Sequence, residues 1–92
     1  VMAGLEVIRS LNDLQYETVR PVEVVVWTNE EGCRYAPAMM GSGVWVGKFD
    51  EADIQSRKDE HGLIFGDELK KIGYYGDEPA KSRPVAAFFE AH

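Results

Sequence analysis

The feature that most constrains this sequence is an apolar run at residues 22–28, which is followed by two adjacent glutamates, Glu30 and Glu31. The run is rich in valine, which is typical of a strand buried on both faces within a parallel or mixed sheet. Burying an unpaired carboxylate is costly, so acids at the end of such a strand favour a bound cation. Open α/β sheets also bind ligands at the carboxyl ends of their strands. We therefore expect the chemistry of this chain at Glu30 and Glu31.

Two adjacent carboxylates can take two different roles in a hydrolytic reaction. One can bind a metal ion, while the other accepts a proton from metal-bound water and returns it to a leaving group. The alternative is an ordinary solvated loop after a strand, because acidic residues are common in loops. The pair alone leaves both interpretations open.

Length and composition indicate one small globular domain of 92 residues, with 45% hydrophobic and 28% charged residues. The net charge of −6 argues against binding a phosphate backbone, so we expect no nucleic-acid partner. The sequence has no apolar run long enough to cross a bilayer and no secretory signal, so we expect no membrane partner. A single cysteine, Cys33, excludes an internal disulfide and suits a cytoplasmic protein. Apolar patterns reach both ends of the sequence, which predicts a piece of a longer protein.

Hydrophobic periodicity predicts an α/β fold in which helices pack on a mostly parallel or mixed sheet. Acids begin the segment 50–58 and bases end it, as the helix dipole favours, and Gly73 is a typical stop for the helix before it. The expected elements are a helix at 1–16, a strand at 22–28, an active-site loop at 29–43, short helices at about 50–58 and 67–72, and a strand at 85–91.

His92 follows the second predicted strand. If the two strands run parallel, their carboxyl ends lie at one edge of the sheet, and Glu31 and His92 converge there. Glutamate and histidine together suit a borderline cation such as zinc. The alternative is that the histidine has no role and simply stands where the chain stops.

Arg34 follows the acidic pair closely. Its guanidinium can hold a carboxylate, for example that of Glu30 or Glu31, or it can face water. We favour a structural role for this residue.

Several blocks of the sequence together resemble one enzyme family, the amidases of the hydantoinase/carbamoylase group. This group includes N-carbamoyl-L-amino-acid hydrolases, allantoate amidohydrolases and β-ureidopropionases, within the two-metal aminoacylase–carboxypeptidase superfamily. The resemblance covers essentially the whole chain. The blocks are Val1-Met2-Ala3-Gly4-Leu5-Glu6, Trp27-Thr28-Asn29-Glu30-Glu31-Gly32, Ala36-Pro37-Ala38-Met39-Met40-Gly41-Ser42-Gly43, Gly73-Tyr74 and Phe89-Glu90-Ala91-His92.

The resemblance implies roles for three residues. Glu30 matches the family's catalytic base and Glu31 matches a metal ligand, while Glu90-Ala91-His92 matches the first half of a motif whose histidine binds metal. The family's two divalent ions, which are Zn, Mn, Co or Ni, take their other ligands from outside the stretch that this sequence matches. The resemblance therefore implies the middle of a larger two-metal catalytic domain, which alone binds metal weakly or not at all.

By this resemblance the parent protein is a metal-dependent amidohydrolase that cleaves linear C–N amide bonds with metal-activated water and a glutamate base. The expected substrates are N-carbamoyl-L-amino acids or related ureido acids, and we expect a homo-oligomer such as a dimer. One alternative is a related aminoacylase or metallopeptidase of the same superfamily. Another is a non-catalytic α/β fragment that self-associates through an unpaired sheet edge.

Overall fold

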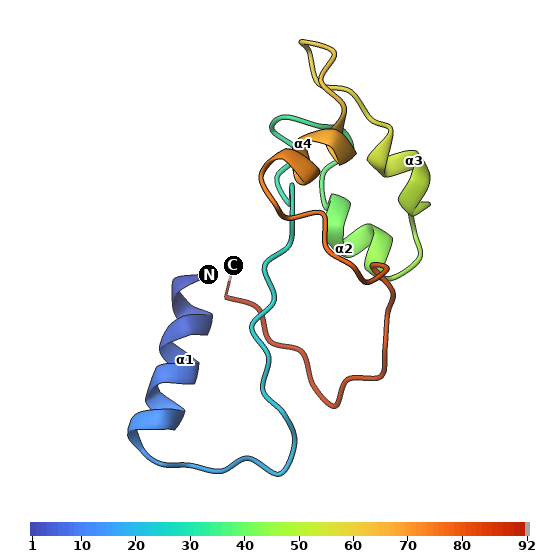
Figure 1. Ribbon diagram of the computed structural model, residues 1–92. Helices are drawn as coiled ribbons and strands as arrows, with labels where there is room; N and C mark the ends of the chain where they lie inside the picture. The colour runs from blue at the N-terminus through green and yellow to red at the C-terminus, as the bar shows by residue number, and fades with distance from the viewer. Residues whose placement is uncertain (92) are drawn as a thin grey trace. The chain divides into compact units, whose positions relative to one another are not determined.

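The computed structural model describes residues 1–91, and in this part of the chain it contains four helices (Figure 1). None of these helices has both the length and the apolar character needed to cross a bilayer. The chain forms two compact units. Unit 1 comprises Val1–Val26 and the segment from Ala86 onward, and unit 2 comprises Trp27–Val85. The helices are α1 (Met2–Asp13), α2 (Met40–Trp45), α3 (Glu51–Gln55) and α4 (Phe65–Lys71).

In unit 1, α1 lies within the predicted helical range 1–16. Its end is a Schellman motif, in which the Tyr16 N–H donates to the Leu11 carbonyl at 2.9 Å and Gln15 has a φ of 52°. The helix approaches the valine-rich run closely at Gly4, where an added Cβ would lie 2.7 Å from Cγ1 of Val24. Glycine at this position therefore allows α1 to pack against the run that the sequence marks as central.

The two segments predicted as strands, residues 22–28 and 85–91, are irregular in the structure. Within residues 1–91 the only β-type pairing is an isolated antiparallel bridge between Lys58 and Ile64. A strand is held by hydrogen bonds to a neighbouring strand, and neither predicted strand has such a neighbour here. Residues such as Val26, which is 60% exposed, are consequently not buried. The predicted parallel or mixed sheet is therefore not confirmed.

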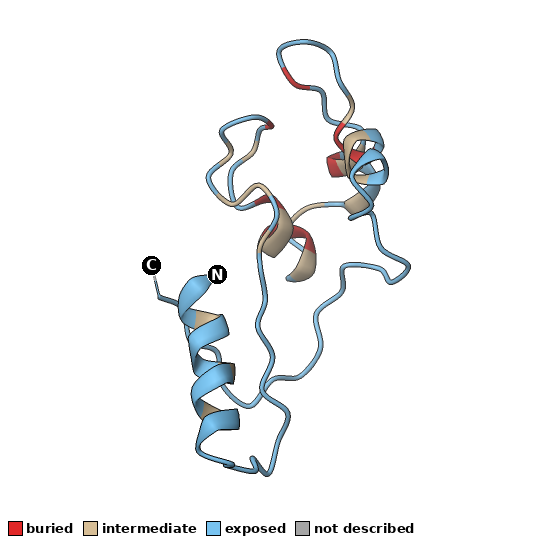
Figure 2. Cartoon of the chain, turned by 60° about the vertical axis from the view of Figure 1, so that its left-hand side comes forward, coloured by how far each residue is buried: buried red, intermediate tan, exposed pale blue. Residues whose placement is uncertain are grey.

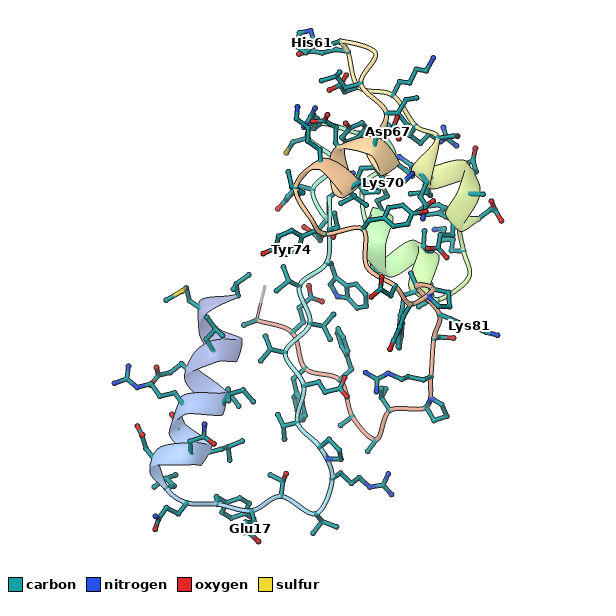
Figure 3. All side chains as sticks on the ribbon, in the orientation of Figure 1. Glu17, His61, Asp67, Lys70, Tyr74 and Lys81 are labelled. Atoms are coloured by element: carbon teal, nitrogen blue, oxygen red, sulfur yellow. The ribbon has the colours of Figure 1, made fainter. Side chains whose placement is uncertain are left out.

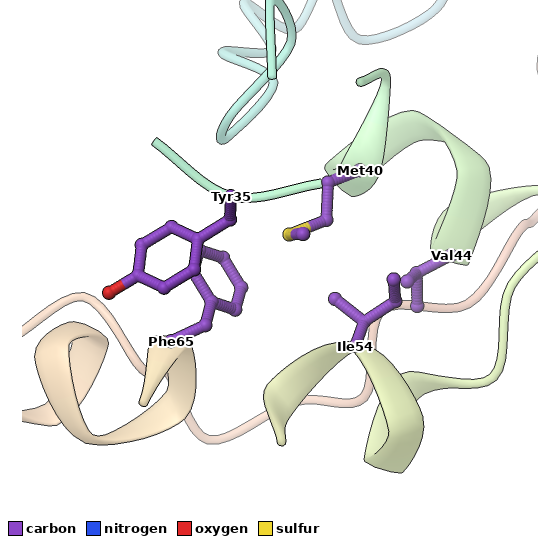
Figure 4. Packing of buried hydrophobic residues seen from close by; sticks show 5 residues of the cluster. All are labelled: Tyr35, Met40, Val44, Ile54 and Phe65. Atoms are coloured by element: carbon purple, nitrogen blue, oxygen red, sulfur yellow. The ribbon is translucent and has the colours of Figure 1, made fainter. Parts of the chain in front are cut away.

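Unit 2 contains the hydrophobic core, to which α2, α3 and α4 each contribute (Figures 2 and 4). In the described residues of unit 1, including α1, no residue is fully buried (Figure 2). Helix α3 contacts both α2 and α4, so these three short helices form one packed group. The buried apolar side chains are Tyr35, Met40, Val44, Ile54 and Phe65.

Helix α2 corrects the prediction of a loop at 29–43, because the chain becomes helical from Met40 onward. The glycines within α2 serve close packing. A Cβ added to Gly43 would lie 2.4 Å from the ring of Phe49. Only glycine lets the helix approach that ring so closely.

Helices α3 and α4 lie in or near the segments predicted as short helices. Asp50 caps α3 by accepting a hydrogen bond from the Asp53 N–H at 2.9 Å. Helix α4 begins at Phe65, before the predicted position 67, and Phe65 also packs into the core. It ends just before Gly73, which has a φ of 77°.

Candidate functional site

The predicted catalytic pair lies on a closed loop at residues 28–41, within unit 2. Backbone hydrogen bonds join the two ends of the loop. Gly41 permits this approach, because a Cβ there would lie only 3.0 Å from the Thr28 nitrogen. The bonds run from the Met39 N–H to the Glu30 carbonyl (2.6 Å), from the Met40 N–H to the Asn29 carbonyl (3.4 Å) and from the Gly41 N–H to the Thr28 carbonyl (3.1 Å).

The side chain of Asn29 forms hydrogen bonds across the inside of the loop. Its Nδ2 donates to the Tyr35 carbonyl at 2.8 Å and also lies 3.4 Å from the Pro37 carbonyl. The backbone of Asn29 has a φ of 51°, a conformation that asparagine adopts more readily than most residues. Asn29 was not among the predicted site residues, although an asparagine directly before the glutamates was the available signal.

The two glutamates differ in exposure, since Glu30 is half-buried and Glu31 is exposed. Their positions are bracketed by Asn29 and by Gly32, which has a φ of 71° and would clash with Ala38 if it carried a Cβ. Within residues 1–91, no hydrogen bond or ion pair engages either side-chain carboxylate. The loop therefore presents two adjacent carboxylates whose oxygens are available to a cation or a proton.

A complete metal site is not present in the part of the chain that the structure describes. No group of three or more histidine, cysteine, aspartate or glutamate side chains converges there. Glu31 fits the role of a single hard oxygen ligand, which alone does not fix a tetrahedral site. His92, the other predicted ligand, lies outside the described residues, so its convergence with Glu31 stays a prediction.

Arg34, near the middle of the loop, binds two carboxylates from other parts of unit 2. Its Nε donates to Oδ2 of Asp59 at 2.9 Å, and its Nη2 donates to Oε2 of Glu68 at 3.0 Å. The guanidinium carbon also lies 5.1 Å from the ring centroid of Tyr35. Arg34 therefore binds carboxylates, but those of Asp59 and Glu68 rather than those of Glu30 or Glu31.

Asp59 is the most buried charged residue of this network, with a side chain that is 1% exposed. Its Oδ1 accepts hydrogen bonds from the N–H groups of Leu63 (2.8 Å) and His61 (3.0 Å), which lie in the turn at residues 57–65. Burial alone would raise the pKa of Asp59. The Leu63 N–H, the Arg34 guanidinium and the His61 N–H outweigh burial and hold the pKa below its ordinary value. The carboxylate is therefore charged and fixed.

The imidazole of His61 is exposed at the tip of the 57–65 turn (Figure 3). Its Nε2 lies 3.3 Å from the carboxylate of Glu60, which is also exposed. This exposed pair gives no metal-ligand geometry among the described residues.

The chain is similar over its whole length to parts of known amidohydrolases. No protein-family model matches it. The chain is 50% identical over its full length to the N-carbamoyl-L-amino-acid amidohydrolase of Rhizobium meliloti and spans 22% of that protein. It is 33% identical to the N-carbamoyl-L-amino acid amidohydrolase of Geobacillus stearothermophilus, again over the whole chain and 23% of that protein.

A solved structure agrees with these sequence relatives. The hydantoinase/carbamoylase family amidase of Burkholderia multivorans matches with a TM-score of 0.89 and 58% identity, over 92% of this chain and 21% of its own. The chain is therefore homologous to the hydantoinase/carbamoylase family of amidases, as the sequence blocks predicted. It spans about a fifth of the length of these relatives.

The buried hydroxyl of Tyr35 has no hydrogen-bond partner within the described chain. Tyr35→Phe removes this unsatisfied group and keeps the ring contact with Phe65, whose centroid lies 5.1 Å away. We expect the free energy of unfolding in urea to stay unchanged or to rise by up to about 1 kcal/mol. As a control, Tyr75→Phe removes an exposed donor to Gln55 and should cost about 0.5–1 kcal/mol. A loss of stability larger for Tyr35→Phe than for Tyr75→Phe would contradict this description of the core.

Asp59 should make the stability of the chain sensitive to acid. Its pKa is lower in the folded chain than the ordinary value of 3.8. The stabilisation is therefore complete above that value and is lost as the pH falls through the folded pKa. Urea denaturation between neutral pH and acid should show this loss in the wild type, with a shallower dependence in Asp59→Asn. Identical pH dependence in both proteins would show that Asp59 is not held as described.

Proposed function

We propose that the protein containing this segment is a metal-dependent amidohydrolase acting on linear C–N amide bonds, with N-carbamoyl-L-amino acids or related ureido acids as substrates. The observation that carries the proposal is the closed loop that presents two adjacent, unpaired carboxylates. Support comes from relatives named N-carbamoyl-L-amino-acid amidohydrolase that match the whole chain. Another relative, from Bacillus subtilis, is named allantoate amidohydrolase and is 27% identical.

Glu30 is the general base in this proposal. Its carbonyl is held by the Met39 N–H, so the position of its backbone is fixed relative to helix α2. The half-buried carboxylate has no competing cationic partner in the described chain, which leaves it able to accept a proton from the attacking water. It then returns that proton to the leaving nitrogen.

Glu31 is a metal ligand in this proposal. It is the more exposed of the two glutamates, so its oxygens can enter a site completed by other parts of the protein. A bound divalent ion supplies Lewis-acid activation of the water and the substrate carbonyl. His92 remains the predicted ligand of the second ion. Zinc as the native metal, a homo-oligomeric assembly and a cytoplasmic location also stay predictions.

The pairing of residues 22–28 and 85–91 as strands belongs to the same proposal. Gly4 already brings α1 against the valine-rich run, as expected of a helix that covers a sheet. The exposed valines of the run would be buried once neighbouring strands and helices of the whole protein are in place.

Glu30→Gln in the full-length protein tests the proposal. The amide cannot accept the proton, so kcat for an N-carbamoyl-L-amino acid should fall by roughly 10²- to 10⁴-fold. Steady-state hydrolysis should be measured together with metal content, because the base is not predicted to bind metal. The matched control is Glu60→Gln, which alters an exposed glutamate in the 57–65 turn and should leave kcat unchanged. A near wild-type kcat for Glu30→Gln would show that the assignment is wrong.

A further inference from the structure

We propose that Arg34 is a positioning residue for the catalytic pair, because it ties the loop that carries Glu30 and Glu31 to the 57–65 turn and to helix α4. The proposal rests on the function proposed above. It assigns to Arg34 an effect on turnover, exerted through the position of the glutamates, in addition to any effect on stability.

The glutamates lie between two fixed points of the chain. On one side, the Glu30 carbonyl accepts the Met39 N–H at the closed base of the loop. On the other side, Arg34 is fixed by its two carboxylate partners. Only residues 31–33 separate Glu30 from Arg34, and a span this short transmits a displacement of one end to the other. Gly32, within this span, lies close to the other side of the loop, since a Cβ added there would be 2.8 Å from the Ala38 Cα.

The anchor that receives Arg34 is itself rigidly held. Asp59 uses one carboxylate oxygen for the N–H groups of His61 and Leu63 and the other for Arg34. The backbone closes the same turn, since the Asp59 N–H donates to the Leu63 carbonyl at 3.1 Å. Removing the arginine would leave a nearly buried carboxylate without its cation, which is unfavourable. Arg34 and Asp59 therefore stabilise each other's position.

The additional contact with Glu68 requires an arginine rather than a lysine at position 34. Glu68 lies on helix α4, and its side chain is 21% exposed. Two separate guanidinium nitrogens reach Asp59 and Glu68, whereas the single ammonium of a lysine is a compact point charge without that fork. We therefore expect lysine to replace Arg34 only in part.

Loss of this connection should reduce turnover. Displacing a catalytic group by about 1 Å can cost on the order of 100-fold in rate. If Arg34 positions Glu30 and Glu31, its removal lowers kcat in protein that is still folded. If Arg34 only stabilises the fold, its removal lowers the melting temperature but leaves kcat of the folded enzyme at the wild-type value.

The test compares Arg34→Met and Arg34→Lys in the full-length, zinc-loaded protein, with kcat and KM for an N-carbamoyl-L-amino acid measured well below the melting temperature. We expect kcat to fall roughly 10- to 100-fold in Arg34→Met, with KM changing far less, and to be intermediate in Arg34→Lys. The matched control is Arg9→Met, because Arg9 belongs to α1 in unit 1 and makes an exposed ion pair with Asp13. Its kcat should match the wild type.

A second variant keeps the test decisive if Arg34→Met does not fold. Asp59→Asn keeps an oxygen that can accept the His61 and Leu63 N–H groups but removes the charge that binds Arg34. It should also lower kcat, and adding it to Arg34→Met should cause no further loss, because Arg34→Met already breaks the contact with Asp59. Wild-type kcat in folded Arg34→Met or Asp59→Asn would overturn the positioning role. If Glu30→Gln is inactive in the same series, the proposed function stands without that role; if Glu30→Gln is active, the proposed function itself fails.

Discussion

The structure of the candidate site depends on the closure of the loop at residues 28–41. A loop that carries charged residues must be ordered at an entropic cost, and here backbone hydrogen bonds at its base offset that cost. The side chain of Asn29 adds a hydrogen bond to the Tyr35 carbonyl inside the loop. The side chain of Tyr35 is buried in the hydrophobic core and so attaches the loop to it. The glutamates therefore stand on a loop that is attached to the core of unit 2.

No basic side chain of the described chain forms an ion pair with Glu30 or Glu31. Arg34 is the cation closest to the pair along the sequence, but its charge is engaged by Asp59 and Glu68. Two carboxylates without a cationic partner in the described chain are open to binding a cation from outside. The same arginine thus fixes the loop while leaving the acidic pair available, which is consistent with a role in metal-assisted hydrolysis.

Local signals predicted the short helices better than the sheet. The acids at the start of the 50–58 segment and the stop at Gly73 are contained in neighbouring residues, and the structure has helices in or near both segments. Helix α2 was missed because its glycines resemble a loop. Gly41 allows a close approach to Thr28, and Gly43 allows one to Phe49. The predicted strand at 22–28 would need hydrogen-bonded partners distant in sequence, and in the described residues this segment has none.

In the candidate site, too, local patterns were predicted from sequence and contacts across the fold were not. Glu30 and Glu31 were predicted from sequence because paired carboxylates after an apolar run form a short, local pattern, and their roles stay predictions. Asn29 was missed as a brace, and Asp59 was missed as the anchor of Arg34, because both act through contacts across the fold. The favoured structural role of Arg34 agrees with its observed ion pairs, but its partners could not be found from spacing alone.

Amide hydrogen exchange at Met39, followed by NMR in the 92-residue chain, tests the closed loop most directly. The Met39 N–H is the donor to the Glu30 carbonyl, so its exchange reports whether the loop is closed. Exchange slowed to a degree similar to that of the Gly43 N–H, which bonds the Met39 carbonyl in the core, is the predicted result. Exchange at the rate of an unstructured peptide would contradict the account, because the glutamates would then have no fixed position.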